Sequence, residues 1–328
     1  MQVKNYRAKR KSIKNVQFMC FGILLLASNT FVYFYAKGKG AIDASESSST
    51  LNLGHSLDSS SDSKSQYGWK TDQLPIMKSI TDGFHPIYVY SKVHDKVRRK
   101  EFSQVKQDKI ILALSIANDA KSTNPTKEKF FVDLAANDAL DLSNTYRLEK
   151  NHWKGLCIEP NPIYWYDLAA YRSCTIVGGF IGGTSSEDGK EVDVILSNGV
   201  FGGIASDQFD NKPENGKMEK RNLVSIETIF RQTNVPTKID YFSLDVEGAE
   251  SIVMADFPWQ AYSFKFVTIE RPKDDLIQIM VRNGYKKALN ITDWGETLWV
   301  NTKEVLLSQQ EIEDIVKDYP NPHSVVKK

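Results

Sequence analysis

The sequence predicts an α/β protein built on an open, mostly parallel sheet with helices on both faces. The first observation is Phe130–Leu134, an apolar run with a single acid, Asp133, which is typical of a strand buried on both faces. Small and polar residues follow at once, and a helical pattern begins at Ala139. The second observation is that apolar runs followed by helical patterns recur along the chain. Strand, turn and helix in that order form the βαβ units of parallel sheets.

Further apolar or alternating runs are predicted to be strands. Three of them lead into an acid, as the first one does, which places Glu159, Asp245 and Glu270 at strand ends together with Asp133. The carboxyl ends of the strands of an open α/β sheet line one crevice, where ligands bind. The runs are Gly155–Glu159, Cys174–Val177, Val192–Leu196, Ile239–Leu244, Phe264–Glu270 and Thr297–Val300.

Capping residues mark the ends of the predicted helices. Ser103–Asp108 precedes the apolar run Ile110–Leu114, which indicates a capped helix that packs on the sheet. Ala139, Leu142 and Tyr146 are spaced for one helix face. Further helices are predicted over Ile163–Ala170, between Ser225 and Pro236, over Ala249–Ala255, from Leu276 to a C-cap at Asn283–Gly284, and over 308–317.

The amino-terminal end is predicted to be a membrane anchor. The chain has 328 residues and a net charge of +1, which gives no field that favours a nucleic acid partner. Residues 1–15 are basic and form the predicted cytosolic tail, and residues 16–36 carry no charge. A helix of about 20 apolar residues can cross a bilayer. The basic side should stay cytosolic, so we expect a single-pass type II protein. A cleaved signal peptide and a buried soluble helix are the alternatives.

The rest of the chain divides into a stem, a domain and a tail. Residues 37–66 are rich in serine and poor in large apolar residues, so they are predicted to be a flexible stem. Residues 67–307 form the predicted globular domain, and residues 308–328 form a terminal helix and tail. Anchor, stem and domain in this order are typical of secretory-pathway enzymes. We therefore expect the domain in the lumen of the Golgi or of another endomembrane compartment.

Two cysteines of the domain, Cys157 and Cys174, lie in or beside neighbouring predicted strands. A disulfide between them is conceivable, but we expect its geometry to be strained and predict two buried thiols. Thiols leave the compartment open. No spacing of cysteines and histidines indicates zinc. The sequon Asn290–Thr292 weakly favours a lumenal face.

Two segments are candidates for close contact with a ligand. Gly178–Gly183 follows the third strand and allows the backbone to approach a bound molecule. Residues 197–218 are rich in glycine, asparagine, aspartate and lysine and form the predicted loop over a pocket. Glu159 can accept hydrogen bonds from two ribose hydroxyls, or it can stabilise the start of the following helix.

Three motifs resemble the FkbM family of methyltransferases. They are Val132–Asp138, Cys157–Pro162 and Ser243–Glu250. The resemblance covers residues 100–301 and implies a class I Rossmann-like sheet, S-adenosylmethionine as methyl donor and O-methylation of a sugar or other hydroxylated acceptor. The family pattern has glycine at two positions where this sequence has Ala135 and Ala139. An added methyl group there could narrow the donor pocket.

The resemblance also implies roles for individual residues. The first-strand turn cradles the amino-acid end of the donor, Glu159 holds its ribose, and Asp245 lies near the transferred methyl. Asp245 is the first candidate for the general base, with Glu247, Glu270 and His94 as alternatives, whereas His152 is expected to cap a helix end. The catalytic candidates are Asp245, Glu247 and Glu270. The donor-binding candidates are Asp133, Ala135, Asn137, Asp138, Glu159, Asn161 and Asp245.

Two other functions remain open. Asp245-Val246-Glu247 resembles the acid-x-acid metal site of a lumenal glycosyltransferase. The two alanines also fit a methyltransferase-like module that binds without catalysis. The predicted partners are a small-molecule or glycan acceptor and the membrane through residues 16–36, with no nucleic acid and no resident metal.

Overall fold

A computed structural model describes residues 69–73, 85–87, 89–92, 102–125, 127–196, 202–206, 212–213 and 216–325. These residues fall within one compact unit, residues 60–328. The predicted basic tail, anchor and stem, and His94, lie outside the described residues. Within the described part, no helix has both the length and the apolar character that a membrane span requires.

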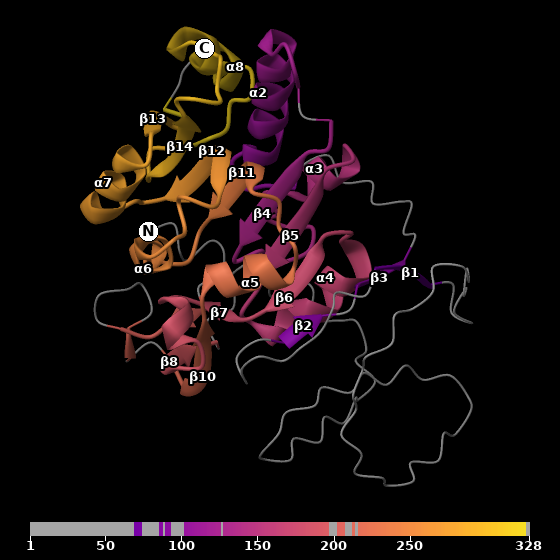
Figure 1. Ribbon diagram of the computed structural model, residues 1–328, viewed down its shortest axis with the longest axis vertical. Helices are drawn as coiled ribbons and strands as arrows, with labels where there is room; N and C mark the ends of the chain where they lie inside the picture. Colours follow the sequence, from indigo (N-terminus) through magenta and orange to yellow (C-terminus); the bar gives the residue numbers. More distant parts are fainter. Residues whose placement is uncertain are drawn as a thin grey trace, which may run out of the picture. The chain divides into compact units, whose positions relative to one another are not determined.

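The core is an eight-stranded sheet in the order β13-β14-β12-β11-β4-β5-β6-β2 (Figure 1). The five strands from β12 to β6 are all parallel to their neighbours, whereas β14 is antiparallel to β12 and β13, and β2 is antiparallel to β6. The strands are β2 (His85–Ile87), β4 (Phe130–Leu134), β5 (Lys154–Ile158), β6 (Thr175–Gly178), β11 (Lys238–Leu244), β12 (Ser263–Glu270), β13 (Tyr285–Asn290) and β14 (Glu296–Asn301). The predicted α/β fold with a mostly parallel, Rossmann-like sheet is confirmed.

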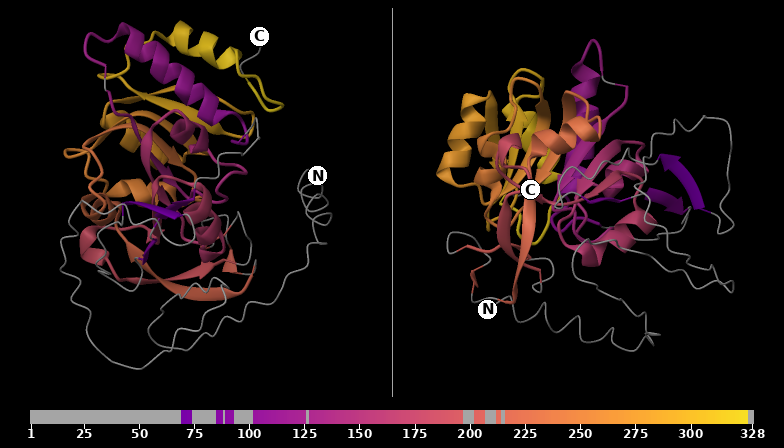
Figure 2. Two further views of the ribbon diagram at one scale, coloured as in Figure 1. Left: turned by 90° about the vertical axis from the view of Figure 1, so that its right-hand side faces the viewer. Right: turned by 60° about the horizontal axis from the view of Figure 1, so that its bottom comes forward.

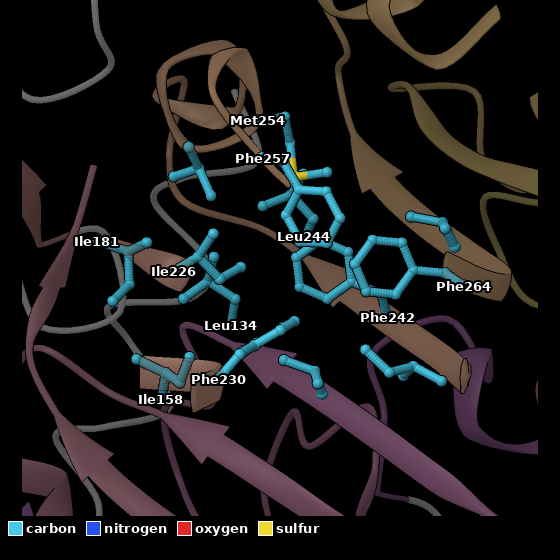
Figure 3. Packing of buried hydrophobic residues seen from close by; sticks show 14 of the residues in the cluster. Leu134, Ile158, Ile181, Ile226, Phe230, Phe242, Leu244, Met254, Phe257 and Phe264 are labelled. Atoms are coloured by element: carbon cyan, nitrogen blue, oxygen red, sulfur yellow. The ribbon is translucent and has the colours of Figure 1, made fainter. Parts of the chain in front are cut away.

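Alternate residues of each buried strand point to opposite faces of the sheet, and each face has its own apolar cluster. On one face, Val132 and Leu134 pack with Phe242 and Leu244 against residues of α5 (Ile226–Gln232), α6 (Glu250–Ala255) and α7 (Asp274–Arg282). Figure 3 shows this cluster, in which the rings of Phe242 and Phe264 are stacked 4.5 Å apart. Burial of strands on both faces explains why their sequences read as continuous apolar runs.

The other face is covered by the remaining helices. Phe131 and Tyr241 pack there with residues of α2 (Gln107–Lys121), α3 (Tyr146–Lys150), α4 (Trp165–Tyr171) and α8 (Gln309–Lys317). Helices α2 and α8 lie side by side, as two views show (Figures 1 and 2). The predicted capping box at Ser308 and Glu311 is present, and Ile312 and Val316 of α8 belong to this cluster. Helices therefore cover both faces, as predicted.

Two smaller sheets and two short 3-10 helices complete the described part. A four-stranded sheet has the order β7-β10-β8-β9, and β1 pairs with β3. Ser225 caps α5, as expected, by accepting a hydrogen bond from the Thr228 backbone. The remaining elements are β1 (Trp69–Gln73), β3 (Val89–Lys92), η2 (Pro162–Tyr164), β7 (Phe180–Ile181), η3 (Ser185–Glu187), β8 (Glu191–Ile195), β9 (Gly203–Ile204) and β10 (Met218–Val224).

The helix predicted to start at Ala139 is wrong. Residues 135–145 form turns, and α3 begins only at Tyr146. Polar side chains explain the difference, because they bind the backbone groups that a helix would use. Asp138 Oδ1 accepts hydrogen bonds from the backbones of Leu140 and Asp141, and Leu142 has a positive φ of 67°.

The prediction of two buried thiols is also wrong. Cys157 of β5 and Cys174 before β6 form a disulfide with a Cα–Cα distance of 6.1 Å. That separation is within the ordinary range for disulfides. The two strands pair in parallel, with Cys157 opposite Ile176, so the bridge reaches Cys174 just before the paired residues begin. This offset removes the geometric objection to a bond between neighbouring strands.

Candidate functional site

A cleft opens at the carboxyl ends of β4, β5 and β11. The chain leaves β4 in one direction along the sheet, through β5 and β6, and later continues from β11 in the other direction. Open α/β sheets bind ligands at such a switch point. The residues that line the cleft are Leu134, Ala135, Asn137, Glu159, Pro160, Tyr164, Gly179, Phe180, Ile181, Gly202, Gly203, Ile204, Asp245, Val246, Glu247 and Ala249.

The turn after β4 has an unusual backbone. Ala135 and Asn137 have positive φ values of 63° and 56°, a region that residues other than glycine rarely adopt. The Ala136 N–H donates to the carbonyl of Ile158, which ties the turn to β5. Both Ala135 and Asn137 line the cleft. The chain therefore adopts, with alanine, the left-handed conformation that glycine would allow without strain at the same position.

Glu159, which directly follows β5, binds the backbone of this turn. It is 3% exposed, and its Oε2 accepts a 2.6 Å hydrogen bond from the Asn137 backbone while Oε1 accepts one of 2.7 Å from Asn161. Each carboxylate oxygen has a second lone pair, so both can accept a further hydrogen bond. Burial raises the pKa of Glu159 to about 7, although the two backbone hydrogen bonds act in the opposite direction. Glu159 thus shapes the turn and faces the cleft.

Trp165 fixes the backbone at the carboxyl end of β5 through a hydrogen bond. Its indole Nε1 donates a 2.8 Å hydrogen bond to the Glu159 carbonyl. The ring reaches this position because Gly178 has no side chain, and a Cβ there would lie 2.3 Å from the ring. The position of Glu159 is therefore set by β5, the Trp165 ring and two backbone donors.

Three of the predicted donor-binding residues do not line the cleft. Asp133 lies on the α3 side of the sheet, where its Oδ2 accepts a 2.5 Å hydrogen bond from the Thr145 hydroxyl. The buried Arg172 donates to the same hydroxyl and to Glu149. Asp138 caps the turn, and Asn161 caps η2 by accepting from the Ile163 backbone. The structure thus gives Asp133, Asp138 and Asn161 internal partners.

Three carboxylates meet at the β11 end of the cleft. One oxygen each of Asp245, Glu247 and Glu270 lies within 4.8 Å of the others. Glu247 has a positive φ of 55°, and the side chains of Glu247 and Glu270 are each 15% exposed. Burial and the charges of Glu270 and Glu247 raise the pKa of Asp245 well above its ordinary value. We call these three residues the carboxylate triad.

The surroundings of the triad are acidic as well. Glu250 is buried and accepts hydrogen bonds from the backbones of Val246 and Gly248, so it shapes the turn after β11. Burial and the charge of Glu270 raise the pKa of the buried Glu296 to about 8. The one cation in contact with the triad, among the ion pairs of the described residues, is the half-exposed Arg271, whose guanidinium lies 2.8 Å from Glu270 and 3.6 Å from Glu247.

Sequence reasoning did not single out several of these residues. Tyr164 lines the cleft but looks like an ordinary core position in the sequence, whereas Phe180 belongs to the predicted contact segment Gly178–Gly183. Arg271 was not among the predicted site residues. The expectation that residues 197–218 lie over a pocket was closer, because Gly202–Ile204 line the cleft. His152 lies just after α3 with φ 66°, and its backbone donates to Glu149, so it ends that helix as expected.

The comparison with protein families agrees with this geometry. Residues 133–287 match the family model described as the methyltransferase FkbM domain. The match confirms the predicted resemblance over a narrower range than residues 100–301, and it contains the turn after β4, Glu159 and the triad. The protein is therefore a methyltransferase. A comparison with curated proteins found no match.

The backbone at the two alanine positions leads to opposite expectations for glycine. We expect Ala135→Gly to raise the free energy of unfolding by about 1 kcal/mol, because relief of an alanine in the left-handed region exceeds the entropy cost of glycine. Ala139 is buried and does not have a positive φ. Ala139→Gly should therefore lower the free energy of unfolding by about 1–2 kcal/mol. Urea denaturation of both variants measures the difference, and a loss of stability in Ala135→Gly would contradict the strained turn.

Proposed function

We propose that this FkbM methyltransferase takes its methyl group from S-adenosylmethionine and transfers it to a hydroxyl group of a sugar or glycan. One observation carries the proposal: Glu159 and Asp245 line the same cleft, although they come from opposite sides of the switch point between β4 and β11. A buried acid that can hold a ribose and a partly buried acid that can act on an acceptor therefore share one cleft.

The residues on the β4 and β5 side fit the donor. Glu159 keeps one lone pair on each oxygen for the two ribose hydroxyls, because the backbone donors use only one on each. The strained turn at Ala135 and Asn137 brings the backbone to the cleft wall without a bulky side chain. Together these features support a site for a nucleoside with a charged amino-acid end.

The residues on the β11 side fit an acceptor. S-adenosylmethionine supplies a methyl group activated by a positively charged sulfur. The hydroxyl oxygen of the acceptor must lose its proton as the new O–CH₃ bond forms, and a carboxylate in the triad can take that proton. Asp245 is the first candidate because it lines the cleft and, within the described part of the chain, its Oδ1 has no hydrogen-bond partner. Alignment of the acceptor in the cleft supplies much of the remaining rate.

The glycosyltransferase alternative gains one supporting observation, because the triad could bind a metal ion. Thermal protection of the full chain separates the two functions. We expect S-adenosylmethionine to raise the melting temperature, and we expect a sugar nucleotide with Mn²⁺ to add nothing beyond Mn²⁺ alone. Protection by the sugar nucleotide, without protection by S-adenosylmethionine, would support glycosyl transfer and reject the proposal.

The alternative of an inactive binding module rested on Ala135 and Ala139. Ala135 already has the backbone conformation that glycine would favour, and it lines the cleft without closing it. The conformation of the turn therefore gives no reason to expect loss of donor binding. If donor binding appeared only after glycine was restored at both positions, the module interpretation would be right.

We also propose that the domain lies in the lumen of an endomembrane compartment, anchored through residues 16–36. The Cys157–Cys174 disulfide supports this placement, because such bonds persist in oxidising compartments. Asn290 of the sequon is exposed. We expect protease added to sealed microsomes to leave the domain intact until detergent is present. Digestion of the domain without detergent would contradict the lumenal placement.

A further inference from the structure

We propose that the carboxylate triad of Asp245, Glu247 and Glu270 binds a hard divalent cation, which presents a pair of neighbouring acceptor hydroxyls to the donor. The inference rests on the proposed function for its second half, whereas the cation site itself depends only on the geometry of the triad. The proposed metal site lies at the β11 end of the cleft. The proposed class of acceptor is a vicinal diol.

The spacing of the three carboxylates fits a metal site. The three oxygens come from the end of β11, the turn that follows it and the end of β12, and they lie within 4.8 Å of one another. Two oxygens on opposite sides of Ca²⁺ are about 4.8 Å apart, and on opposite sides of Mg²⁺ about 4.2 Å. A shift of well under 1 Å per oxygen would let all three contact one ion.

Among the described residues, one carboxylate oxygen of the triad lacks a hydrogen-bond partner. Within the described part of the chain, Asp245 Oδ1 is buried and has no hydrogen-bond partner. Buried carboxylate oxygens are normally paired, because the loss of solvation is costly. Asp245 also lines the cleft, so the unsatisfied oxygen belongs to a group that a ligand can reach. A cation at the triad would satisfy it and would offset the mutual repulsion of three carboxylates.

Arg271 occupies part of the position that a cation would take. Its guanidinium contacts Glu270 and Glu247, but it makes no ion pair with Asp245. The Arg271 side chain is 48% exposed, so solvent screens its ion pairs with the triad. We therefore expect Arg271 to compete with the cation for the triad.

The ligand set selects the ion and leaves room for an acceptor. Carboxylate oxygens alone favour Mg²⁺, Mn²⁺ or Ca²⁺ over softer metals. Three ligands occupy about half of the six positions around Mg²⁺ or Mn²⁺, and the others can take water or hydroxyl groups. A vicinal diol fills two neighbouring positions, and binding to the cation lowers the pKa of the hydroxyl that loses its proton.

Titration of the full chain with Mn²⁺ alone tests the site, with bound ion counted by electron paramagnetic resonance. We expect one ion per chain, and we expect Asp245→Asn and Glu270→Gln each to weaken binding by tenfold or more, since even residues behind metal ligands change affinity by about 10–100-fold. Arg271→Gln should strengthen binding several-fold. Asp275→Asn, which removes an exposed acid of α7 outside the triad, is the matched control and should leave binding unchanged.

Each outcome decides the inference. Absence of stoichiometric binding, or equal affinities for wild type, Asp245→Asn and Glu270→Gln, would reject the site, provided that circular dichroism shows each variant folded. Weaker binding in Arg271→Gln would also reject the competition that the geometry implies. A parallel titration with S-adenosylmethionine keeps the two proposals apart, because Mn²⁺ can bind without the donor and the donor can bind without Mn²⁺.

Discussion

Asp245→Asn should reduce methyl transfer by about 10²–10⁴-fold while donor affinity stays within about twofold, because general-base help typically contributes that much to the rate. Asparagine keeps the size of the side chain and part of its hydrogen bonding, but it cannot take the acceptor proton. Asp245 lines the cleft at the end of β11, whereas the turn after β4 and Glu159 supply the proposed contacts to the donor. The measurement is paired: donor affinity by calorimetry and single-turnover rate on the same protein, once an acceptor is known.

Variants of the other two acids show which carboxylate takes the proton. If Glu247 or Glu270 is the base, the rate should survive in Asp245→Asn and collapse in Glu247→Gln or Glu270→Gln. If Asp245 holds the donor instead, affinity should fall together with the rate. With a cation at the triad, excess Mn²⁺ should restore the rate of Glu270→Gln, which loses only a ligand, but not that of Asp245→Asn, which loses the base as well as a ligand.

Glu159→Gln should weaken donor binding by about 10–100-fold, because hydrogen bonds to a charged acceptor contribute roughly 1.5–3 kcal/mol. The same substitution should also lower the stability of the protein. Glu159 also accepts from the backbones of Asn137 and Asn161, and glutamine can replace only one of these acceptors. The free energy of unfolding should therefore fall by about 1–3 kcal/mol, the cost of one buried unpaired donor.

A second buried acid separates the two effects of Glu159→Gln. Glu149 pairs with the buried Arg172 at 2.6 Å and does not line the cleft. Glu149→Gln should lower stability without changing donor affinity, measured by urea denaturation and calorimetry. If Glu149→Gln weakens donor binding as much as Glu159→Gln does, the loss reflects general destabilisation and Glu159 is not a ligand.

The raised pKa of Glu159 adds a pH dependence with a definite sign. Ribose hydroxyls donate to the carboxylate, so the donor prefers the ionised form, and binding should lower the pKa below its value of about 7 in the free protein. Donor affinity should therefore increase as pH rises from 6 to 7 and level off above pH 8. A flat profile over this range would show that Glu159 does not change its charge there.

Much of the sheet could be predicted because its strands carry their own signal. Phe130–Leu134 and Ile239–Leu244 are buried on both faces, so each reads as an unbroken apolar run, and each leads into the residues that line the cleft. In contrast, β13 (Tyr285–Asn290) has two lysines at its exposed positions and lies at the sheet edge, where its pattern resembles a loop. The sequence pattern detects burial, and edge strands have little of it.

The direction in which each acid points could not be predicted from strand ends alone. Asp133 and Glu159 both lie near the end of a buried strand, yet Asp133 is paired with Thr145 on the α3 side and Glu159 faces the cleft. The partner of Asp133 depends on turns that replace the predicted helix after Ala139. The Cys157–Cys174 bond was missed for a similar reason, because it depends on the offset between β5 and β6.

Calorimetric titration of the full chain with S-adenosylmethionine tests the central claim most directly, namely that the cleft between β4, β5 and β11 binds the methyl donor. We predict saturable binding at one site per chain, weakened in Glu159→Gln and unchanged in Glu149→Gln. No heat of binding with S-adenosylmethionine under conditions in which a sugar nucleotide binds, or equal donor affinities in wild type and a folded Glu159→Gln variant, would contradict it.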